Sequence, residues 1–410
     1  MPEDFLHHPL AAKMRPVLLV LLLGLVGPLL CCRTVWAQSG GGGKFATSLC
    51  AELIEPNNYT CIEYRAVTDD GFILGLQNIP CPRGQNKSTY GPPVLLMHGV
   101  LAGGDNFVVN SPQESLAFVL ADAGFNVWIG NNRAVQWSHG HVMLNPSQNA
   151  YWNWTYDELA SYDLKALTHY VYNQTNQTKL TYIGHSQGTL MLFAGLTGGL
   201  FKTQILGYLK AAVQLAPVAY VSHITPPILK VGLEIYADTL LPVIGNGEFD
   251  ANIFINLTCT SPLITDLACD NVYQGVVGNN GYVNQSRLEF YSQYYPQPTS
   301  SFNLNHFGQS YRQDTFQFYA RGLGGVLLNN PPKYNLTSFP ESLPLQLWTG
   351  CIDGLADTTD VNRLLAELPD SDYREVKNLA DYGHLDFIYG YRAYIDVYPN
   401  IITFLNNHTS

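Results

Sequence analysis

The sequence predicts an α/β fold with a mostly parallel central sheet and one large insertion. Three observations support this prediction. Apolar runs of strand length alternate with helix-compatible segments along the first half of the chain. One of these runs, at 180–183, leads through a glycine-flanked turn directly into a helix-compatible segment. Finally, the 123 residues from 220 to 342 lie between two predicted strands, whereas a crossover between parallel strands needs only about a dozen.

The predicted elements begin with a hairpin, followed by βα alternation. Asp69-Asp70-Gly71 lies between two stretches of strand composition within 60–77, and such a turn is a strong hairpin signal. Further strands are expected at 93–97, 125–129, 180–183, 209–218, 343–348 and 373–377, and helices at 113–123, 157–172 and 189–196. Strands that alternate with helices predict a mostly parallel sheet covered on both faces.

The insertion at 220–342 is expected to form a cap or lid over a core made of residues 48–219 and 343–410. Within it, Ile228 to Leu241 has the pattern of a lid helix that starts at Pro226-Pro227 and stops at Pro242. Its apolar face would carry Leu229, Leu233, Tyr236 and Leu240, and its polar face Lys230, Glu234 and Asp238. The apolar arc is wide, so a plain buried helix fits the pattern equally well.

The N-terminus, residues 1–37, reads as a signal peptide. Lys13 and Arg15 precede an apolar run of 14 residues, which is short for a membrane span. Val35-Trp36-Ala37 supplies small residues at the −3 and −1 positions of a cleavage site, and a signal anchor is the alternative. Residues 38–47 would then be a flexible mature N-terminus, and no second apolar stretch approaches transmembrane length. We therefore expect a soluble protein in a lumen or outside the cell.

Glycosylation sequons support the secretory route. The candidates are Asn58, Asn86, Asn173, Asn176, Asn256, Asn284, Asn335 and Asn407. A ninth sequon begins at Asn153, inside the aromatic cluster Tyr151-Trp152-Asn153-Trp154. We expect that asparagine to be buried and unmodified.

The cysteines are compatible with an oxidising compartment. Six remain after removal of the signal peptide: Cys50, Cys61, Cys81, Cys259, Cys269 and Cys351. The local pairs Cys50–Cys61 and Cys259–Cys269 are favoured as disulfides, and the state of the other two stays open. No spacing of cysteine and histidine suggests a zinc site. The formal net charge of −11 disfavours nucleic acid as a partner.

The turn Gly184-His185-Ser186-Gln187-Gly188 is typical of the nucleophile elbow of the α/β-hydrolases. A serine hydroxyl becomes a good nucleophile only when a base takes its proton, and the elbow lifts the oxygen clear of the sheet. The two glycines leave room for a strained backbone and for close packing of strand and helix. The alternative is an ordinary turn serine between glycines, so the rest of the chain has to decide.

A base and an acid should follow the serine in chain order. Only His384 and His408 come after His306, and His408 lies in a sequon close to the C-terminus. His384, in a loop after the last predicted strand, is therefore the candidate base.

Asp353 is the candidate acid because it comes first after the strand at 343–348. Asp357 and Asp360 are its competitors, although their spacing suggests the first turns of a helix, where carboxylates often act as caps.

An oxyanion hole needs two backbone N–H donors. Gln187, directly after the nucleophile, should supply one. Val100, after the strand that ends at His98-Gly99, should supply the other, with Leu101 as the fallback. His98 itself fits a structural loop residue better than a second base.

Taken together, several blocks resemble the acid lipase family, which comprises gastric lipase, lysosomal acid lipase and secreted plant triacylglycerol lipases. They run from about residue 50 to 400. The blocks are Asp69-Asp-Gly-Phe-Ile-Leu, His98-Gly-Val-Leu-Ala, Gly130-Asn-Asn-Arg, Trp152-Asn-Trp-Thr-Tyr-Asp-Glu-Leu-Ala-Ser-Tyr-Asp-Leu, Gly184-His-Ser-Gln-Gly-Thr, Gly245-Asn-Gly-Glu-Phe, Asp353-Gly-Leu-Ala-Asp-Thr-Thr-Asp-Val and His384-Leu-Asp-Phe-Ile-Tyr-Gly.

The resemblance implies an α/β-hydrolase core with a large cap after the sixth strand, and Ser186, Asp353 and His384 as a triad. It also implies a disulfide in the cap, which maps onto Cys259 and Cys269. The chain departs from the family pattern at Ala134, where glycine is usual, and at Gly350-Cys351, where Gly-Gly is usual. The early lid region is hard to align, which leaves substrate selection open.

The sequence therefore predicts a serine carboxylester hydrolase, secreted or in the lumen of a vacuole or lysosome. The expected substrate is an acylglycerol at a lipid–water interface, and no metal or organic cofactor is expected. A sterol-ester hydrolase and an esterase of small soluble esters share the same triad and remain alternatives. A non-catalytic lipid carrier on this scaffold is the alternative outside enzymes.

Overall fold

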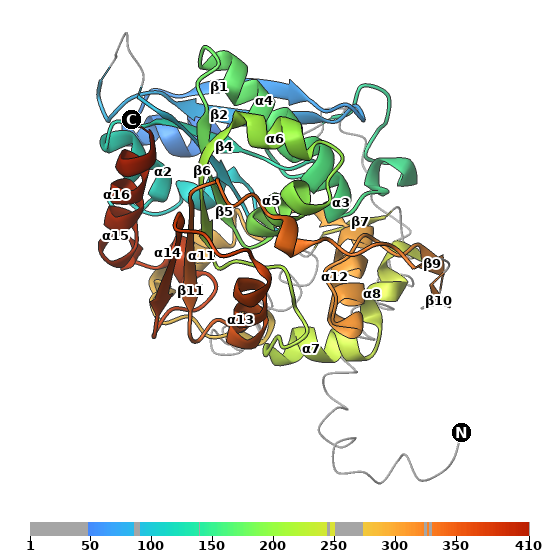
Figure 1. The fold of residues 1–410 in the computed structure, drawn as a ribbon. Coiled ribbons are helices and arrows are strands. Elements are labelled where there is room, and N and C mark those ends of the chain that lie inside the picture. Colours follow the sequence, from blue (N-terminus) through green and yellow to red (C-terminus); the bar gives the residue numbers. More distant parts are fainter. Residues whose placement is uncertain are drawn as a thin grey trace, which may run out of the picture.

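An eight-stranded sheet forms the centre of the molecule (Figure 1). The computed structural model describes residues 48–85, 91–138, 140–243, 247–250, 274–323, 326–327 and 330–409. In spatial order the strands are β1 (Ile62–Val67), β2 (Ile73–Ile79), β4 (Asn126–Gly130), β3 (Pro93–Met97), β5 (Leu180–His185), β6 (Leu209–Leu215), β11 (Leu345–Gly350) and β12 (Arg374–Leu379). The ladders of β1 with β2 and of β2 with β4 are antiparallel, and the others are parallel. The predicted mostly parallel sheet is confirmed.

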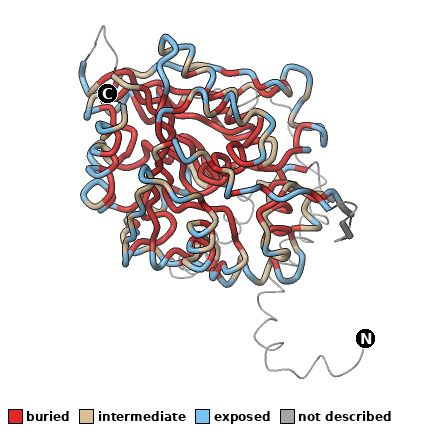
Figure 2. The backbone as a smooth tube through the Cα atoms, viewed as in Figure 1, coloured by how far each residue is buried: buried red, intermediate tan, exposed pale blue. Residues whose placement is uncertain are grey.

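Helices cover both faces of this sheet, as Figure 1 shows. The main ones are α2 (Leu116–Asp122), α4 (Leu164–Gln174), α5 (Gln187–Thr197), α6 (Lys202–Tyr208), α13 (Thr358–Glu367) and α16 (Tyr398–Thr409). Strands β3, β4 and β5 are buried along their whole length, and Figure 2 shows the buried chain gathered around them. Such continuous burial explains why these strands read as apolar runs rather than as alternating patterns. Within the described part of the chain, no single helix is long and apolar enough to cross a membrane; α5 and α6 meet that criterion only jointly, with a bend of 118°.

The two largest differences between predicted and observed boundaries are three residues each, and both have local reasons. The first predicted helix starts at Leu116 instead of 113, because the preceding residues form a turn in which Ser115 donates to the Asn110 carbonyl. The strand predicted to reach 218 ends at Leu215, because Ala216 has a φ of +49° and leaves the extended conformation.

The predicted helix at 157–172 is present but consists of three parts. Thr155 and Glu158 form a capping box at the start of α3 (Tyr156–Glu158). A π-helical turn, η7 (Leu159–Asp163), then leads into α4.

The carboxylate of Asp163 is fully buried and pairs with Arg133, which is 1% exposed. Two guanidinium nitrogens of Arg133 lie 2.8 and 2.6 Å from Asp163 Oδ1, and a third lies 2.7 Å from Asp70 Oδ2 at the hairpin turn. The guanidinium also covers the ring of Phe72. The next residue, Ala134, has a φ of +69°, a conformation that glycine adopts more easily. This network ties the first hairpin to the loop after β4 and to η7.

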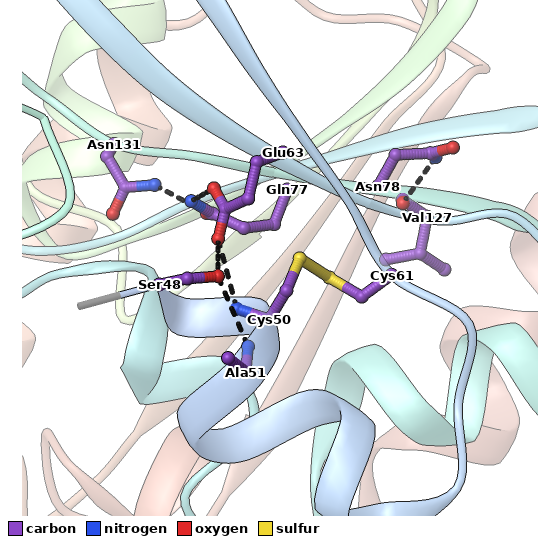
Figure 3. Close-up of a disulfide and its surroundings, with 9 residues drawn as sticks. All are labelled: Ser48, Cys50, Ala51, Cys61, Glu63, Gln77, Asn78, Val127 and Asn131. Carbon is purple, nitrogen blue, oxygen red and sulfur yellow. Dashed lines mark hydrogen bonds between the residues drawn. A yellow bond between two sulfur atoms is a disulfide. The ribbon is translucent and has the colours of Figure 1, made fainter. Parts of the chain in front are cut away.

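A disulfide closes the N-terminal part of the described chain (Figure 3). Cys50, in the π-helical turn η3 (Cys50–Ile54), is bonded to Cys61, one residue before β1, as the sequence predicted. Beside it, the Glu63 carboxylate accepts hydrogen bonds from Ser48, from the Cys50 backbone and from Gln77. Cys81 is buried and Cys351 exposed, and both are free thiols. The predicted pair Cys259–Cys269, the signal peptide at 1–37 and the segment 38–47 lie outside the described residues.

The expectation of a buried Asn153 is wrong, because the structure places this asparagine among the exposed residues while its aromatic neighbours are buried. Asn284 is half-buried and caps a 3₁₀ turn. The other described candidates, Asn58, Asn173, Asn176, Asn335 and Asn407, are exposed, and Asn86 and Asn256 lie outside the described residues. Asn153 therefore joins the candidate glycosylation sites on the ground of exposure.

The insertion leaves the sheet after β6 and returns at β11, and these two strands are hydrogen-bonded neighbours. Its described parts contribute no strand to the central sheet. They include α7 (Pro227–Glu234), α8 (Ala237–Leu240) and α12 (Ser301–Gln313). Figure 1 shows α12 and α8 side by side at one end of the molecule.

The single helix predicted at 228–241 is broken. Its predicted faces hold in the first half, where Leu233 is buried and Lys230 and Glu234 are exposed, and are wrong in the second half. Tyr236 has a φ of +60° and separates α7 from α8. Asp238, predicted on the polar face, is 5% exposed, whereas Tyr236 and Leu240, predicted on the apolar face, are 50% and 53% exposed. The reason is an ion pair that periodicity does not show: Arg312 of α12 lies 2.7 Å from the Asp238 carboxylate and draws it inward.

A buried polar contact joins the insertion to the loop after β3. The Gln297 backbone donates to the Leu101 carbonyl at 2.6 Å, and its side chain accepts from the Gln136 backbone and donates to Asp105 Oδ1. Trp137 donates to the same oxygen. Asp105 is fully buried, and burial raises the pKa of its carboxyl to about 7.

The buried Arg133 pair generates a prediction about stability. Replacing Arg133 with Met leaves the Asp163 charge buried without its partner, which should lower the free energy of unfolding by about 3–5 kcal/mol. Urea unfolding measures this difference. Lys377→Met removes one partner of the exposed pair with Glu375 and should cost less than about 1 kcal/mol. Equal effects of the two substitutions would contradict the structural role of Arg133.

Asp105 generates a prediction about pH. Its folded-state pKa lies above the unfolded value, so the folded protein holds an extra proton and the free energy of unfolding should fall as pH rises from about 4 to about 7. A shift of this size corresponds to on the order of 4 kcal/mol. Asp105→Asn keeps the acceptor oxygen for Trp137 and should flatten this part of the curve. Urea unfolding at pH 4, 5.5 and 7 tests it; parallel curves for the wild type and the variant would show that Asp105 is not responsible.

Candidate active site

The nucleophile candidate sits on a sharp turn between β5 and α5. Ser186 has φ +54° and ψ −119°, a conformation that is costly for a residue with a side chain. The turn is possible because its two glycines pack against each other: a Cβ at Gly184 would lie 2.8 Å from the Gly188 carbonyl carbon. The hydroxyl of Thr189 donates to the Ser186 carbonyl at 2.6 Å and closes the turn. The strand–turn–helix context that the motif requires is therefore present.

The structure brings Ser186, His384 and Asp353 together. His384 Nε2 lies 2.8 Å from Ser186 Oγ, and His384 Nδ1 lies 2.9 and 3.1 Å from the two oxygens of Asp353. The exposed fractions are 8% for the serine, 2% for the histidine and 3% for the aspartate. With Nδ1 protonated toward the carboxylate, Nε2 is free to accept the hydroxyl proton. This arrangement has the geometry of a nucleophile, a base and an orienting acid.

Asp353 is fixed by the turn after β11, where the backbone N–H groups of Leu355 and Ala356 both donate to Oδ1 at 2.8 Å. Its two competitors are engaged elsewhere. Asp357 caps α13 by accepting from the Thr359 backbone. Asp360 is buried and accepts hydrogen bonds from His223, a residue of the insertion. The structure thus places only the first of the three aspartates against His384.

Two further histidines near the serine have structural contacts. His185 Nε2 lies 2.9 Å from the His384 carbonyl, and burial lowers the pKa of His185 to about 3, so the neutral ring donates to that oxygen. His98 bridges the Gly99 carbonyl and the Asn132 backbone N–H, and burial lowers its pKa to about 4. His98 is therefore a neutral loop residue, as its position suggested.

The loop after β3 lies directly against the nucleophile. A Cβ added at Gly99 would lie 3.0 Å from Ser186 Cβ, so position 99 has room for glycine and not for a larger residue. Val100 follows at once, and Leu101 has a φ of +57° that turns the chain. On the other side, Gln187 opens α5, so its backbone N–H belongs to the free N-terminus of that helix. Gln187 thus follows the serine directly, and Val100 follows the glycine that packs against it.

Sequence reasoning missed the residues of the insertion that contact this site. Asn303 of α12 is fully buried and donates to the Gln187 side chain at 2.8 Å. Gln297 binds the Leu101 carbonyl, as described above. Both are polar residues without a motif around them. Apart from a comparison with relatives, the sequence holds no signal that pairs them with positions more than a hundred residues away.

Comparisons with known proteins agree with the fold and the motifs. A family model described as a partial α/β-hydrolase lipase region matches residues 50–111, and one described as the α/β hydrolase fold matches 92–195. Among solved structures, a soluble variant of monoglyceride lipase from Saccharomyces cerevisiae matches with a TM-score of 0.52 at 14% identity, covering 84% of this chain and 96% of that one. This likeness concerns the fold alone.

Curated relatives match over most of the chain. Triacylglycerol lipase 1 of Arabidopsis thaliana is 40% identical, with 88% of this chain and 91% of the relative covered. Human lysosomal acid lipase/cholesteryl ester hydrolase is 34% identical, covering 93% and 98%, and mouse gastric triacylglycerol lipase is 34% identical, covering 87% and 91%. The chain belongs to this family of α/β-hydrolase lipases.

Proposed function

We propose that this protein is a serine carboxylester hydrolase that cleaves acylglycerols as a triacylglycerol lipase. The observation that carries the proposal is the contact of His384 Nε2 with Ser186 Oγ at 2.8 Å, with Asp353 on the other ring nitrogen. Membership of a family whose relatives are named triacylglycerol lipases supports the substrate class.

The proposed reaction proceeds through an acyl-enzyme. Ser186 attacks the ester carbonyl while His384 takes its proton, and Asp353 stabilises the imidazolium. The backbone N–H groups of Gln187 and Val100 stabilise the oxyanion. Collapse of the tetrahedral intermediate expels the alcohol, which receives the proton from His384. Water, activated by the same histidine, then releases the fatty acid and restores the serine.

We propose that residues 220–342 form the cap over this site and that the enzyme works at a lipid–water interface. Exposed apolar side chains of the α7–α8 region support this, namely Ile235, Tyr236 and Leu240. Isolated exposed apolar residues are common, but three within six positions favour contact with an apolar phase.

We place the enzyme in a secretory compartment, outside the cell or in a vacuole or lysosome. The Cys50–Cys61 disulfide and the exposed sequons support an oxidising, glycosylating route. The apolar N-terminal segment, read as a signal peptide, agrees with that route.

A sterol-ester hydrolase is the second candidate. The human relative named lysosomal acid lipase/cholesteryl ester hydrolase aligns with 93% of this chain at 34% identity. The catalytic chemistry would be identical, and the cap would select the alcohol.

The triad assignment predicts how substitutions act. Ser186→Ala should lower kcat by about 10⁴–10⁶-fold, because only the oxyanion hole and binding remain. Asp353→Asn should lower it by about 10⁴-fold, because the amide favours the wrong histidine tautomer. Asp357→Asn should leave kcat unchanged, because asparagine also caps a helix. Hydrolysis of a short soluble ester measures all three; an inactive Asp357→Asn beside an active Asp353→Asn would reverse the assignment.

The lipase assignment predicts a substrate order. Emulsified triolein should be cleaved with a rate that rises above the solubility limit of the lipid, whereas a water-soluble short-chain ester should show no such rise. A cholesteryl ester in the same emulsion tests the second candidate. The Ser186→Ala variant controls for contaminating hydrolases. Cleavage of the soluble ester alone would exclude a lipase, and faster cleavage of the cholesteryl ester would favour the sterol-ester hydrolase.

A further inference from the structure

The loop that carries His384 is interlocked with the inserted segment 279–283. The first half of the interlock is the Asp386 side chain, which is fully buried two residues after His384. Its Oδ2 accepts from the backbone N–H groups of Gly383 and Gly281, and its Oδ1 accepts from that of Tyr282, all at 2.7 Å. One carboxylate thus binds the histidine loop and the insertion at the same time.

The second half is reciprocal. Asn280, in the insertion, accepts from the backbone N–H of Leu385 through Oδ1 at 2.8 Å and donates to the Gly278 carbonyl through its amide nitrogen. The contact continues beyond the loop, since the Tyr391 backbone donates to the Tyr282 carbonyl at 3.0 Å. The core therefore holds the insertion through Asp386, and the insertion holds the core through Asn280.

The two backbones are packed too closely for either to shift alone. A Cβ added at Gly383 would collide with the Asn279 carbonyl, and one added at Gly281 would collide with the Asp381 carbonyl. Glycine is required at both positions because the backbones approach each other directly.

These contacts fix the peptide group after His384 at both its N–H and its carbonyl, and they also fix the N–H of Gly383 before it. The Asp386 carboxylate accepts from the N–H of Gly383, and the Asn280 side chain accepts from the N–H of Leu385. The ring of His185 donates to the carbonyl of His384. An error of about 1 Å in the position of a catalytic group can cost about 10²-fold in rate. The His384 ring has to contact Ser186 and Asp353 at the same time. A shift of the His384 backbone would therefore move the ring away from at least one of them.

We propose that Asn280 and Asp386 are positioning residues, and that the inserted segment 279–283 holds the catalytic histidine in place relative to Ser186 and Asp353. This inference rests on the proposed function of Ser186, Asp353 and His384. It assigns to the insertion a part in catalysis that is separate from covering the substrate. The segment has this part because Asn280 and the backbone at 281–282 bind the loop that carries the catalytic histidine.

Asn280→Ala is the direct test, with Asn57→Ala as the matched control. Asn57 also makes one part-buried hydrogen bond to a carbonyl, that of Leu53, in the N-terminal segment next to the disulfide. Each variant is compared with the wild type by kcat and KM on a soluble short-chain ester, by the rate of covalent labelling with a fluorophosphonate, and by urea unfolding. The soluble ester avoids any effect of lipid binding.

The inference predicts that Asn280→Ala lowers kcat and the labelling rate by about 10-fold or more, leaves KM within about twofold, and stays folded. Asn57→Ala should match the wild type in both rates. Rates of Asn280→Ala within twofold of the wild type would overturn the inference, as would equal losses in the two variants. A raised KM at unchanged kcat would also overturn it, because the segment would then shape substrate access. The proposed function fails separately, if the wild type is not labelled or Ser186→Ala still is.

Discussion

The strained turn at Ser186 is the constraint on which the rest of the site depends. A positive φ at a residue with a side chain costs on the order of 1–3 kcal/mol and persists only where the surroundings enforce it. Here β5 is hydrogen-bonded on both sides, by β3 and β6, and Gly184 and Gly188 let α5 pack onto the strand end. The turn presents the hydroxyl at the carboxyl edge of the parallel strands. Loops after β3, β11 and β12 reach the same edge, which is why residues from four distant parts of the sequence converge there.

The sheet and the three triad candidates could be predicted because their signals are local. The central strands β3, β4 and β5 are apolar runs, Ser186 and Asp353 each follow a predicted strand within a few residues, and chain order leaves His384 as the candidate base. The insertion resisted prediction because long-range contacts decide its structure. Helical periodicity placed Asp238 toward solvent, but Arg312 binds it inside. The aromatic neighbours of Asn153 are buried as expected, while the asparagine itself is exposed, since one residue in an irregular turn does not follow its neighbours.

Polar contacts from the insertion reach the loops that carry Gln187, Leu101 and His384. Asn303 binds the Gln187 side chain, Gln297 binds the Leu101 carbonyl, and Asn280 binds the amide after His384. These bonds are buried or half-buried, where leaving a donor or an acceptor without its partner costs about 1–3 kcal/mol. In the proposed mechanism the core supplies the reacting groups and the insertion fixes their loops, so the two parts of the chain stabilise one arrangement together.

Two titratable groups at the junction of the insertion and the core, His223 and Asp105, both make the folded protein more stable at acid pH than at neutral pH. His223, at the start of the insertion, binds Asp360, and this hydrogen bond raises the pKa of the histidine. Its contribution to stability is therefore full below the pKa of the unfolded histidine and is lost as pH rises through the folded-state pKa. Burial raises the pKa of Asp105, beside Gln297, and this group too stabilises the folded protein on the acid side. Both contacts join the insertion to the core, so acid conditions should strengthen that junction.

Trapping the acyl-enzyme is the most direct test of Ser186 as the nucleophile. A chromogenic ester is mixed rapidly with the protein, the reaction is quenched in acid during turnover, and the digested peptides are identified by mass spectrometry. We expect one acyl group, on Ser186, that disappears as the substrate is exhausted. An acyl group on another residue, or turnover without any acylated peptide at Ser186, would contradict it.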